Sequence, residues 1–249
     1  MGYTVSGNQY ASISEVMKKN FKQFSQKKEV TIFIGNLSQK EYRSQQILDW
    51  IYNRLATSFD EMTDLTKEFR EELNKTAYIS NLRLLHLQVS SDGTRKFLFE
   101  LEDGESVESV LIPNVRGENK FTLCISSQVG CALGCSFCLT GKLGLKRNLN
   151  SYEIVDQVIS ASRIIKKETG EITNIVFMGM GEPLYNLDHV ASALDIIADG
   201  EGISISKRRV TVSTSGRARL RWTSTAPPRA RCSSSTPSTR SSRWSARPW

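Results

Sequence analysis

The sequence predicts an α/β fold, in which a small helical domain precedes a parallel β-sheet. Between residues 43 and 75, apolar residues recur every three or four positions, the spacing of helices with one buried face. Strand-like and helix-like segments then alternate between residues 121 and 216, a pattern typical of parallel strands joined by right-handed crossovers. Three unusual loops follow the strands, at the edge where such sheets carry their sites.

The first hundred residues predict helices followed by a hairpin. One helix is expected over residues 43–59 and another over residues 60–75, each with one apolar face. The apolar positions are Ile47, Leu48, Ile51, Tyr52 and Leu55 in the first, and Leu65, Phe69 and Leu73 in the second. Segments 84–90 and 94–101 flank a short polar turn, which predicts a β-hairpin. We expect residues 1–100 to form an accessory domain that serves as a scaffold or docking surface.

Residues 117–216 predict the α/β core. Its first strand is expected over residues 121–126 (FTLCIS), directly before a cysteine-rich loop. Asn150 followed by Glu153 three positions later is a capping box, which predicts the start of a helix. The apolar face of that helix consists of Ile154, Val155, Val158, Ile159 and Ile164.

The second half of this core repeats the same order of elements. An apolar strand beginning near Thr173 leads into a glycine loop, and a helix is expected over residues 190–199. A last strand lies within residues 208–216. The cysteine loop, the glycine loop and the turn after the last strand therefore all fall at the carboxyl edge of the predicted sheet.

The positive charge of the chain is concentrated at its end. Of 33 basic and 26 acidic residues, eight arginines and no acidic residue fall within residues 217–249. The remaining 25 basic residues nearly balance the 26 acidic ones, so net charge alone does not indicate nucleic-acid binding. The segment is rich in Ser, Arg and Pro without periodicity, which favours either a disordered basic tail or an out-of-frame translation.

Hydropathy argues against membrane insertion and secretion. No apolar run approaches the roughly 18 residues that a membrane span needs. The beginning of the sequence is polar and charged and contains no apolar signal segment. We therefore expect a cytoplasmic protein with no membrane partner, in which clustered cysteines indicate metal binding or catalysis before disulfides.

Three of the five cysteines, Cys131, Cys135 and Cys138, form a CxxxCxxC motif. Thiolates are soft ligands that suit zinc or iron–sulfur clusters. A structural zinc site usually draws four ligands from two separated pairs, and the sequence has no second CxxC pair. Three ligands on one tight loop match a 4Fe–4S cluster with one open iron. A zinc site and three buried core cysteines are the alternatives.

The glycine loop, residues 179–183 (GMGEP), is a second candidate. Glycines allow the backbone to approach a ligand closely, and the carboxylate of Glu182 suits an ammonium group. Ser213 and Thr214 end the last predicted strand, where they either hydrogen-bond a cofactor or form a turn.

CxxxCxxC with Phe137 before the last cysteine is the pattern of radical S-adenosylmethionine (SAM) enzymes. The segments TLCISSQVGCALGCSFC, TNIVFMGMGEPLYN and SKRRVTVSTSG closely resemble the RlmN family, and QILDWIYNR resembles its N-terminal accessory domain. That family methylates C2 of adenine in 23S rRNA and tRNA. The resemblance, from about residue 35 to residue 216, implies a partial (β/α) radical-SAM barrel preceded by a small helical accessory domain.

The resemblance also implies cofactors and site residues. The cofactors are one 4Fe–4S cluster and S-adenosyl-L-methionine. The implied cluster ligands are Cys131, Cys135 and Cys138, and the implied cofactor contacts are Gly181, Glu182 and Ser213. Glu108 matches the proton acceptor, and Cys124 matches a redox cysteine that forms a disulfide during turnover.

The implied partners are 23S rRNA, tRNA and an electron donor such as flavodoxin. Two local basic groups suit RNA phosphates, although solvated surface charge is an equal alternative. They are Lys142, Lys146 and Arg147 after the cysteine loop, and Lys207, Arg208 and Arg209 before the last strand.

Residues 217–249 depart from the family. They match neither its later barrel strands nor the segment with its methyl-carrying cysteine, and Cys232 has no matching context. We therefore expect this chain to be unable to complete methyl transfer. The alternative functions are a non-enzymatic zinc or RNA-binding fragment and a paralogue that methylates C8 of adenine.

Overall fold

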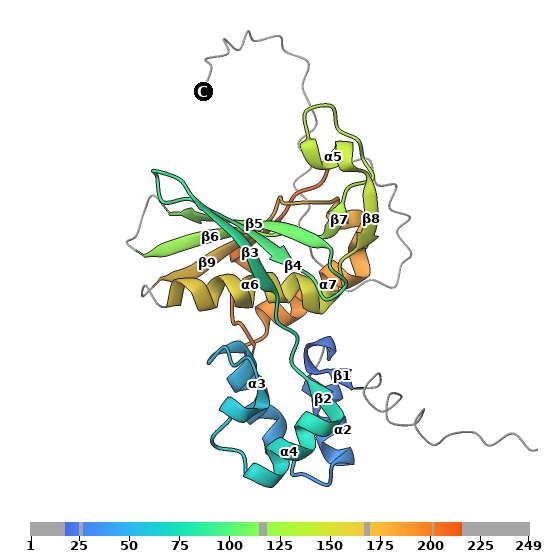
Figure 1. Ribbon diagram of the computed structural model, residues 1–249, viewed down its shortest axis with the longest axis vertical. Helices are drawn as coiled ribbons and strands as arrows, with labels where there is room; N and C mark the ends of the chain where they lie inside the picture. Colours follow the sequence, from blue (N-terminus) through green and yellow to red (C-terminus); the bar gives the residue numbers. More distant parts are fainter. Residues whose placement is uncertain (1–17, 25–26, 115–118, 167–169, 201, 216–249) are drawn as a thin grey trace, which may run out of the picture. The chain divides into compact units, whose positions relative to one another are not determined.

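The computed structural model describes residues 18–24, 27–114, 119–166, 170–200 and 202–215 (Figure 1). The described residues from 18 to 214 form one compact unit, and the tail predicted over 217–249 lies outside the described residues. None of the described helices has both the length and the apolar character needed to cross a bilayer.

The N-terminal part of this unit is a small helical bundle. Its elements are β1 (Lys19–Asn20), η1 (Phe21–Gln23), α2 (Lys27–Asn36), α3 (Tyr42–Tyr52), η2 (Phe59–Glu61), α4 (Lys67–Thr76) and β2 (Ala77–Tyr78). The apolar faces predicted for α3 and α4 are buried together with Phe21, Phe59 and Met62. The accessory helices are therefore confirmed, although both are shorter than the sequence predicts.

Local backbone chemistry explains the shorter helices. The helix predicted over residues 43–59 ends at Tyr52, and Leu55 adopts a left-handed φ of 65°, which an α-helix does not tolerate. The helix predicted over residues 60–75 begins only at Lys67, because the Thr66 side chain accepts a hydrogen bond from the Phe69 backbone N–H over 3.4 Å.

The remaining elements build the α/β part. The strands are β3 (Arg83–Val89), β4 (Arg95–Glu100), β5 (Ser106–Pro113), β6 (Lys120–Cys124), β7 (Gln128–Gly130), β8 (Leu145–Asn148), β9 (Glu171–Phe177) and β10 (Val210–Val212). The helices are α5 (Leu139–Leu143), α6 (Ser151–Lys166), η3 (Pro183–Asn186), α7 (Leu187–Ala198) and η4 (Lys207–Arg209).

Six strands form one mixed sheet in the order β10-β9-β6-β5-β4-β3. The strands β6, β9 and β10 are parallel, as the sequence predicts, whereas β3 to β6 are antiparallel neighbours. The predicted hairpin is confirmed, and it joins this sheet through the pairing of β4 with β5. The described strands form an open sheet with β10 and β3 at its edges, so the mixed α/β architecture is confirmed while barrel closure is not seen among them.

One face of the sheet holds the core. The strand β5 alternates between buried Val107, Ser109 and Leu111 and less buried positions between them. Figure 1 shows α6 and α7 beneath this face, and their apolar side chains complete the core. The opposite face therefore receives the alternate residues of β5 and β6, which include Glu108, Val110 and Cys124.

The helix α6 carries buried polar side chains as well as the predicted apolar face. One of the two hydrogen bonds of the predicted capping box is confirmed: the Asn150 backbone N–H donates to Glu153 Oε2 over 2.7 Å. Asp156 is fully buried and forms an ion pair with Lys22, whose Nζ also donates to the Ser80 carbonyl over 2.5 Å. Polar bonds therefore join the helical bundle to α6.

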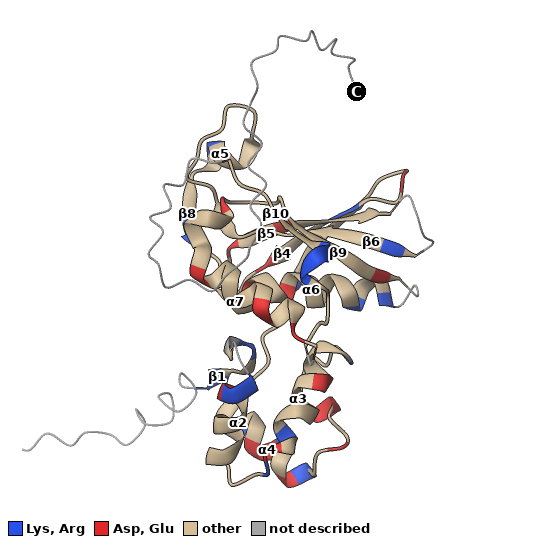
Figure 2. Ribbon diagram, turned by 180° about the vertical axis from the view of Figure 1, so that it is seen from behind, with Lys and Arg blue, Asp and Glu red and all other residues tan. Residues whose placement is uncertain are grey.

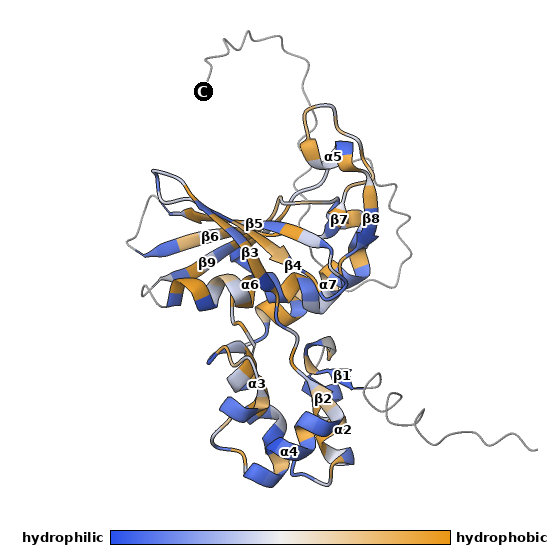
Figure 3. Ribbon diagram, in the orientation of Figure 1, coloured by the Kyte–Doolittle hydropathy of each residue, from blue (hydrophilic) through white to orange (hydrophobic). Residues whose placement is uncertain are grey.

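The edge strand β3 is exposed along its whole length although much of it is hydrophobic (Figure 3). Leu84, Leu85 and Leu87 each expose more than a third of their surface. Charged residues of both signs are interspersed over the described elements (Figure 2).

Candidate functional site

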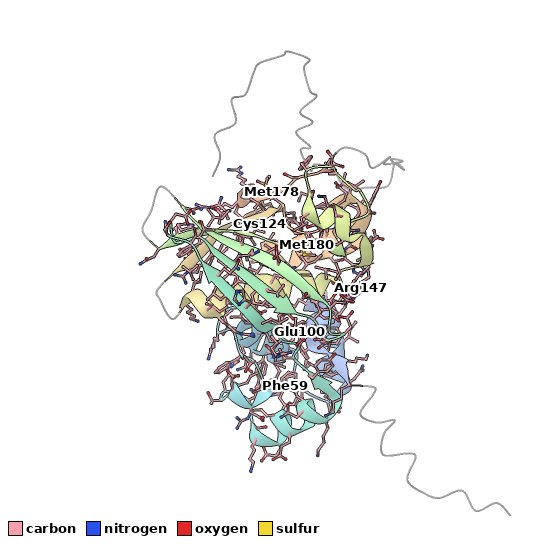
Figure 4. The ribbon with its side chains drawn as sticks, turned by 45° about the horizontal axis from the view of Figure 1, so that its top comes forward. Phe59, Glu100, Cys124, Arg147, Met178 and Met180 are labelled. Carbon is pink, nitrogen blue, oxygen red and sulfur yellow. The ribbon has the colours of Figure 1, made fainter. Side chains whose placement is uncertain are left out.

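Cys124 ends β6 on the face of the sheet opposite α6 and α7. It pairs with Val110 of β5 and Val176 of β9, and its thiol accepts a hydrogen bond from the Met178 backbone N–H. Burial raises the pKa of the Cys124 thiol, and the bond from Met178 only partly opposes this shift. Cys124, Met178 and Met180 gather at one end of the sheet (Figure 4).

Glu108 lies on the same face, in β5. Its carboxylate is 45% exposed and forms an ion pair of 3.0 Å with Lys96 Nζ from β4. Its backbone N–H donates to Met180 Sδ over 3.4 Å. The structure thus connects Glu108 directly to the glycine loop, which lies about seventy residues further along the chain.

Ser126 provides a second connection between β5 and the glycine loop. Its hydroxyl donates to the Glu108 carbonyl over 2.6 Å and accepts from the Met180 backbone N–H over 2.9 Å. Gln157 of α6 holds both backbone groups of Ser126, since its Oε1 accepts from the N–H over 2.8 Å and its Nε2 donates to the carbonyl over 3.0 Å. Every polar group of Ser126 is therefore bonded.

The glycines of the loop serve this packing. An added Cβ at Gly179 would lie 2.7 Å from Ser126 Oγ, and one at Gly181 would lie 2.5 Å from the Cβ of Gln128. Gly181 also has a φ of 99°, which L-residues rarely adopt. The loop thus approaches residues 125–128 closely, at positions where only glycine fits.

Glu182 follows these glycines and is 3% exposed. Its Oε1 accepts from the Leu184 N–H over 3.2 Å and caps η3, and its own N–H donates to Gln128 Oε1 over 2.8 Å. Ser213, the third predicted cofactor contact, is partly buried just after β10. Because β10 runs parallel to β9, Ser213 lies at the same edge of the sheet as the glycine loop.

The cysteine motif occupies the connection between the short antiparallel strands β7 and β8. Gly130 has a φ of 76°, and a Cβ there would lie 1.8 Å from the Gly144 carbonyl oxygen. The same carbonyl accepts a hydrogen bond of 3.0 Å from the Cys131 N–H, which closes the base of the loop. Within the loop the Cys138 N–H donates to the Cys135 carbonyl over 3.0 Å.

The donor chemistry of this loop fits an iron–sulfur cluster, because it offers three free thiols on one short segment. Their arrangement is not that of a formed metal site, since the described residues contain no group of three or more His, Cys, Asp or Glu positioned to bind a metal ion. All four cysteines of the described part are free, so the expected disulfide has no support there.

Three of the basic residues that suit RNA phosphates already have acidic partners. Lys146 Nζ lies 2.7 Å from Glu105, and Arg147 bonds both Asp103 and Glu153. The pKa of Arg147 is raised above its ordinary value, chiefly by its hydrogen bonds to Glu153. Lys207 also has a partner, since it pairs with Asp195 over 3.4 Å.

The sequence did not reveal the polar residues that hold the site together. Asn186 donates to the carbonyls of Ser127 and Leu149 over 2.8 and 2.7 Å, and Gln128 donates to Asn148 over 2.7 Å. The polar run SSQ after β6 was the available signal, because a buried strand continued by polar residues requires hydrogen-bond partners.

Comparison with known proteins identifies the class. Residues 125–222 match the radical SAM superfamily, and residues 19–79 match the ribosomal RNA large subunit methyltransferase N-terminal domain. The fold and the cysteine loop are therefore those of a radical SAM protein.

Among curated relatives, the dual-specificity RNA methyltransferase RlmN of Pelobacter propionicus is 54% identical over 184 residues, covering 74% of this chain and 51% of the relative. That of Geobacter sulfurreducens is 54% identical over 188 residues, covering 76% and 50%. This chain belongs to the RlmN family of radical SAM proteins, and it spans about half the length of the curated relatives it matches.

A solved structure agrees with this assignment. The crystal structure of a radical SAM methyltransferase from Sphaerobacter thermophilus matches with a TM-score of 0.74 and 38% identity. The match covers 80% of this chain and 57% of that one.

Proposed function

We propose that this chain carries the radical SAM core of an enzyme that methylates C2 of adenine in 23S rRNA and tRNA, and that it does not itself complete methyl transfer, because residues 217–249 match no segment with a methyl-carrying cysteine. Its curated relatives are dual-specificity RNA methyltransferases. The observation that carries the proposal is the convergence of Glu108, Cys124 and the glycine loop, through contacts of Met178 and Met180, at one end of the sheet. Three candidates from separate parts of the sequence thus share one location.

In this proposal Cys131, Cys135 and Cys138 hold a 4Fe–4S cluster, and Gly181, Glu182 and Ser213 contact S-adenosyl-L-methionine. When bound, these two groups supply the radical chemistry that an electrophilic carbon such as C2 requires, with an electron from a donor protein such as flavodoxin. The residues of the chain position the adenine and handle its proton.

Glu108 is the proposed proton acceptor. Its carboxylate is half-exposed on the open face of the sheet and is held by Lys96, so it is oriented and accessible to a base. The ion pair with Lys96 orients the carboxylate, and the bond from the Glu108 backbone N–H to Met180 Sδ holds the backbone. Cys124 is the proposed redox thiol. Its partner would be a cysteine linked to the base through a thioether, which residues 217–249 do not supply in a matching context. Attack of the Cys124 thiolate on that sulfur would form a disulfide and break the S–C bond, and the released carbon would take up a proton to give the methyl group.

Cluster formation is the first test. The whole chain is reconstituted anaerobically with iron and sulfide, and about four irons with acid-labile sulfide per chain are expected. Colourless protein that binds zinc in place of iron would refute the cluster and favour the zinc fragment.

Modification of RNA is the second test. RNA from cells with and without the gene is digested and analysed by mass spectrometry. No gene-dependent 2-methyladenosine is expected from this chain, and its detection would refute the proposed inactivity. Gene-dependent 8-methyladenosine would instead identify the C8-methylating paralogue.

A further inference from the structure

We infer that the acidic turn between β4 and β5, residues 102–105, is a clamp that positions the cysteine loop by pairing with Lys146 and Arg147. The turn lies about forty residues before β8 in the sequence and contacts it in the fold. The inference rests on the proposed function, because it gives the turn a role in holding the cluster ligands.

The inner half of the clamp is a bidentate pair. Arg147 NH1 and NH2 each lie 2.8 Å from an oxygen of Glu153, at the start of α6. The Glu153 carboxylate is almost fully buried, and its Oε2 also accepts from the Asn150 N–H. A fork-to-fork pair of this kind fixes direction as well as distance.

The outer half of the clamp comes from the acidic turn. Arg147 Nε donates to Asp103 Oδ2 over 2.7 Å, and Lys146 Nζ lies 2.9 and 2.7 Å from the two oxygens of Glu105. Consecutive basic residues of β8 therefore meet two acids of one turn.

The strand pairing transmits this position to the cysteines. Arg147 lies opposite Val129 in the β7–β8 ladder, and Gly130 lies opposite Leu145. Cys131 follows Gly130 directly, and its N–H is bonded to Gly144. Because β8 is fixed by the clamp and β7 is fixed by β8, the first cysteine is held at the base of the loop.

The cysteine loop itself has little other support. Phe137 and Leu139 within it are 91% and 74% exposed, and Cys135 and Cys138 are only partly buried. The ordered base, where Cys131 is buried, contrasts with this exposed tip. The clamp therefore acts at the base of the loop, next to the buried Cys131, and not at its exposed tip.

Charge reversal tests the clamp in the whole chain. The single variants Glu105→Lys and Lys146→Glu each place like charges together, and the double variant restores the pair with opposite polarity. Arg83→Glu is the matched control, because it creates the same repulsion with Glu100 on β3 and β4, away from the cysteine loop. Melting followed by circular dichroism establishes that all four variants fold.

The first measurement is the alkylation rate of each cysteine in iron-free protein, resolved by peptide mapping. In both single variants Cys131 should react about two- to fivefold faster. This is the factor by which the loss of one exposed ion pair is expected to raise the fraction of chains in which the loop is locally open. The double variant and Arg83→Glu should match the wild type, and Cys124, outside the loop, should be unchanged. Single variants with wild-type rates, or a double variant no slower than the singles, would overturn the clamp.

The second measurement is the rate of iron loss to a chelator after anaerobic reconstitution. Both single variants should lose iron faster than the wild type, and the double variant and Arg83→Glu should lose it at the wild-type rate. Faster alkylation of Cys131 with unchanged iron loss would overturn the role of the clamp in holding the cluster. If the wild-type chain takes up no iron, the proposed function fails, and the alkylation rates still decide whether the clamp exists.

Discussion

The Met180 backbone N–H donates to the Ser126 hydroxyl over 2.9 Å, and this bond ties the glycine loop to the end of β6. The same hydroxyl donates to the carbonyl of Glu108 over 2.6 Å. One buried side chain therefore sets the spacing between the strand that carries the proposed base and the loop that carries the proposed cofactor contacts.

Ser126→Ala should destabilise the chain by about 1–3 kcal/mol, because it leaves a buried N–H and a buried carbonyl without their partner. Ser160→Ala is the matched control, since Ser160 is also a buried serine but its Oγ has no hydrogen-bond partner among the described residues. Urea unfolding should show a change near zero, or a slight gain, for that control. Equal losses in the two variants would contradict the importance of the Ser126 network.

Gly181→Ala should cost about 1–3 kcal/mol, because its positive φ disfavours a side chain and the new Cβ would contact Gln128. Gly35→Ala is the opposite case: Gly35 lies in α2, and a Cβ there meets nothing within 4 Å. That substitution should stabilise the chain by about 0.5–1 kcal/mol. Thermal and urea unfolding measure both, and a stabilising Gly181→Ala would mean that the loop does not adopt this conformation.

Elements whose burial follows a simple period could be predicted from the sequence. The helix α6 was predicted correctly, because its capping box and apolar spacing are local signals. The strand β5 was not recognised, because the buried position Ser109 interrupts its apolar alternation. The hydroxyl of Ser109 is satisfied by Gln157 over 2.9 Å, a partner on a distant helix.

The same distinction applies to the site. The cysteine spacing and the glycine loop are contiguous motifs, and they indicated the candidate residues directly. The network of Ser126 and Gln157, and the pairing of Arg147 with Asp103, join segments about thirty to forty-four residues apart. Such contacts depend on how strands pair and helices cross, so no local pattern announces them.

The buried ion pair of Lys22 and Asp156 should behave as a coupled unit. Burial lowers the pKa of Lys22 and raises that of Asp156, and each partner opposes the shift of the other. Lys22→Met should therefore cost about 3–5 kcal/mol, because it leaves the Asp156 carboxylate buried without its cation. Lys22→Met with Asp156→Leu should cost less than the sum of the single variants.

The exposed pair of Lys207 and Asp195 is the control for this cycle. Lys207→Met should change the unfolding free energy by less than about 1 kcal/mol. Additive single and double variants at Lys22 and Asp156 would show that the two side chains do not interact in the folded chain.

Reactivity of Cys124 should depend on pH in a way that reports its burial. Its pKa is raised from the ordinary 9.0 by burial, so the folded chain holds the thiol proton to higher pH than the unfolded chain. The resulting stabilisation is fully present below pH 9.0 and is lost as pH rises through the folded pKa. Relative to Cys124→Ala, the wild-type unfolding free energy should therefore fall as the pH rises above 9.0. Alkylation of Cys124 should show its inflection at higher pH than a peptide of residues 121–127, and coincident curves would contradict the burial of this thiol.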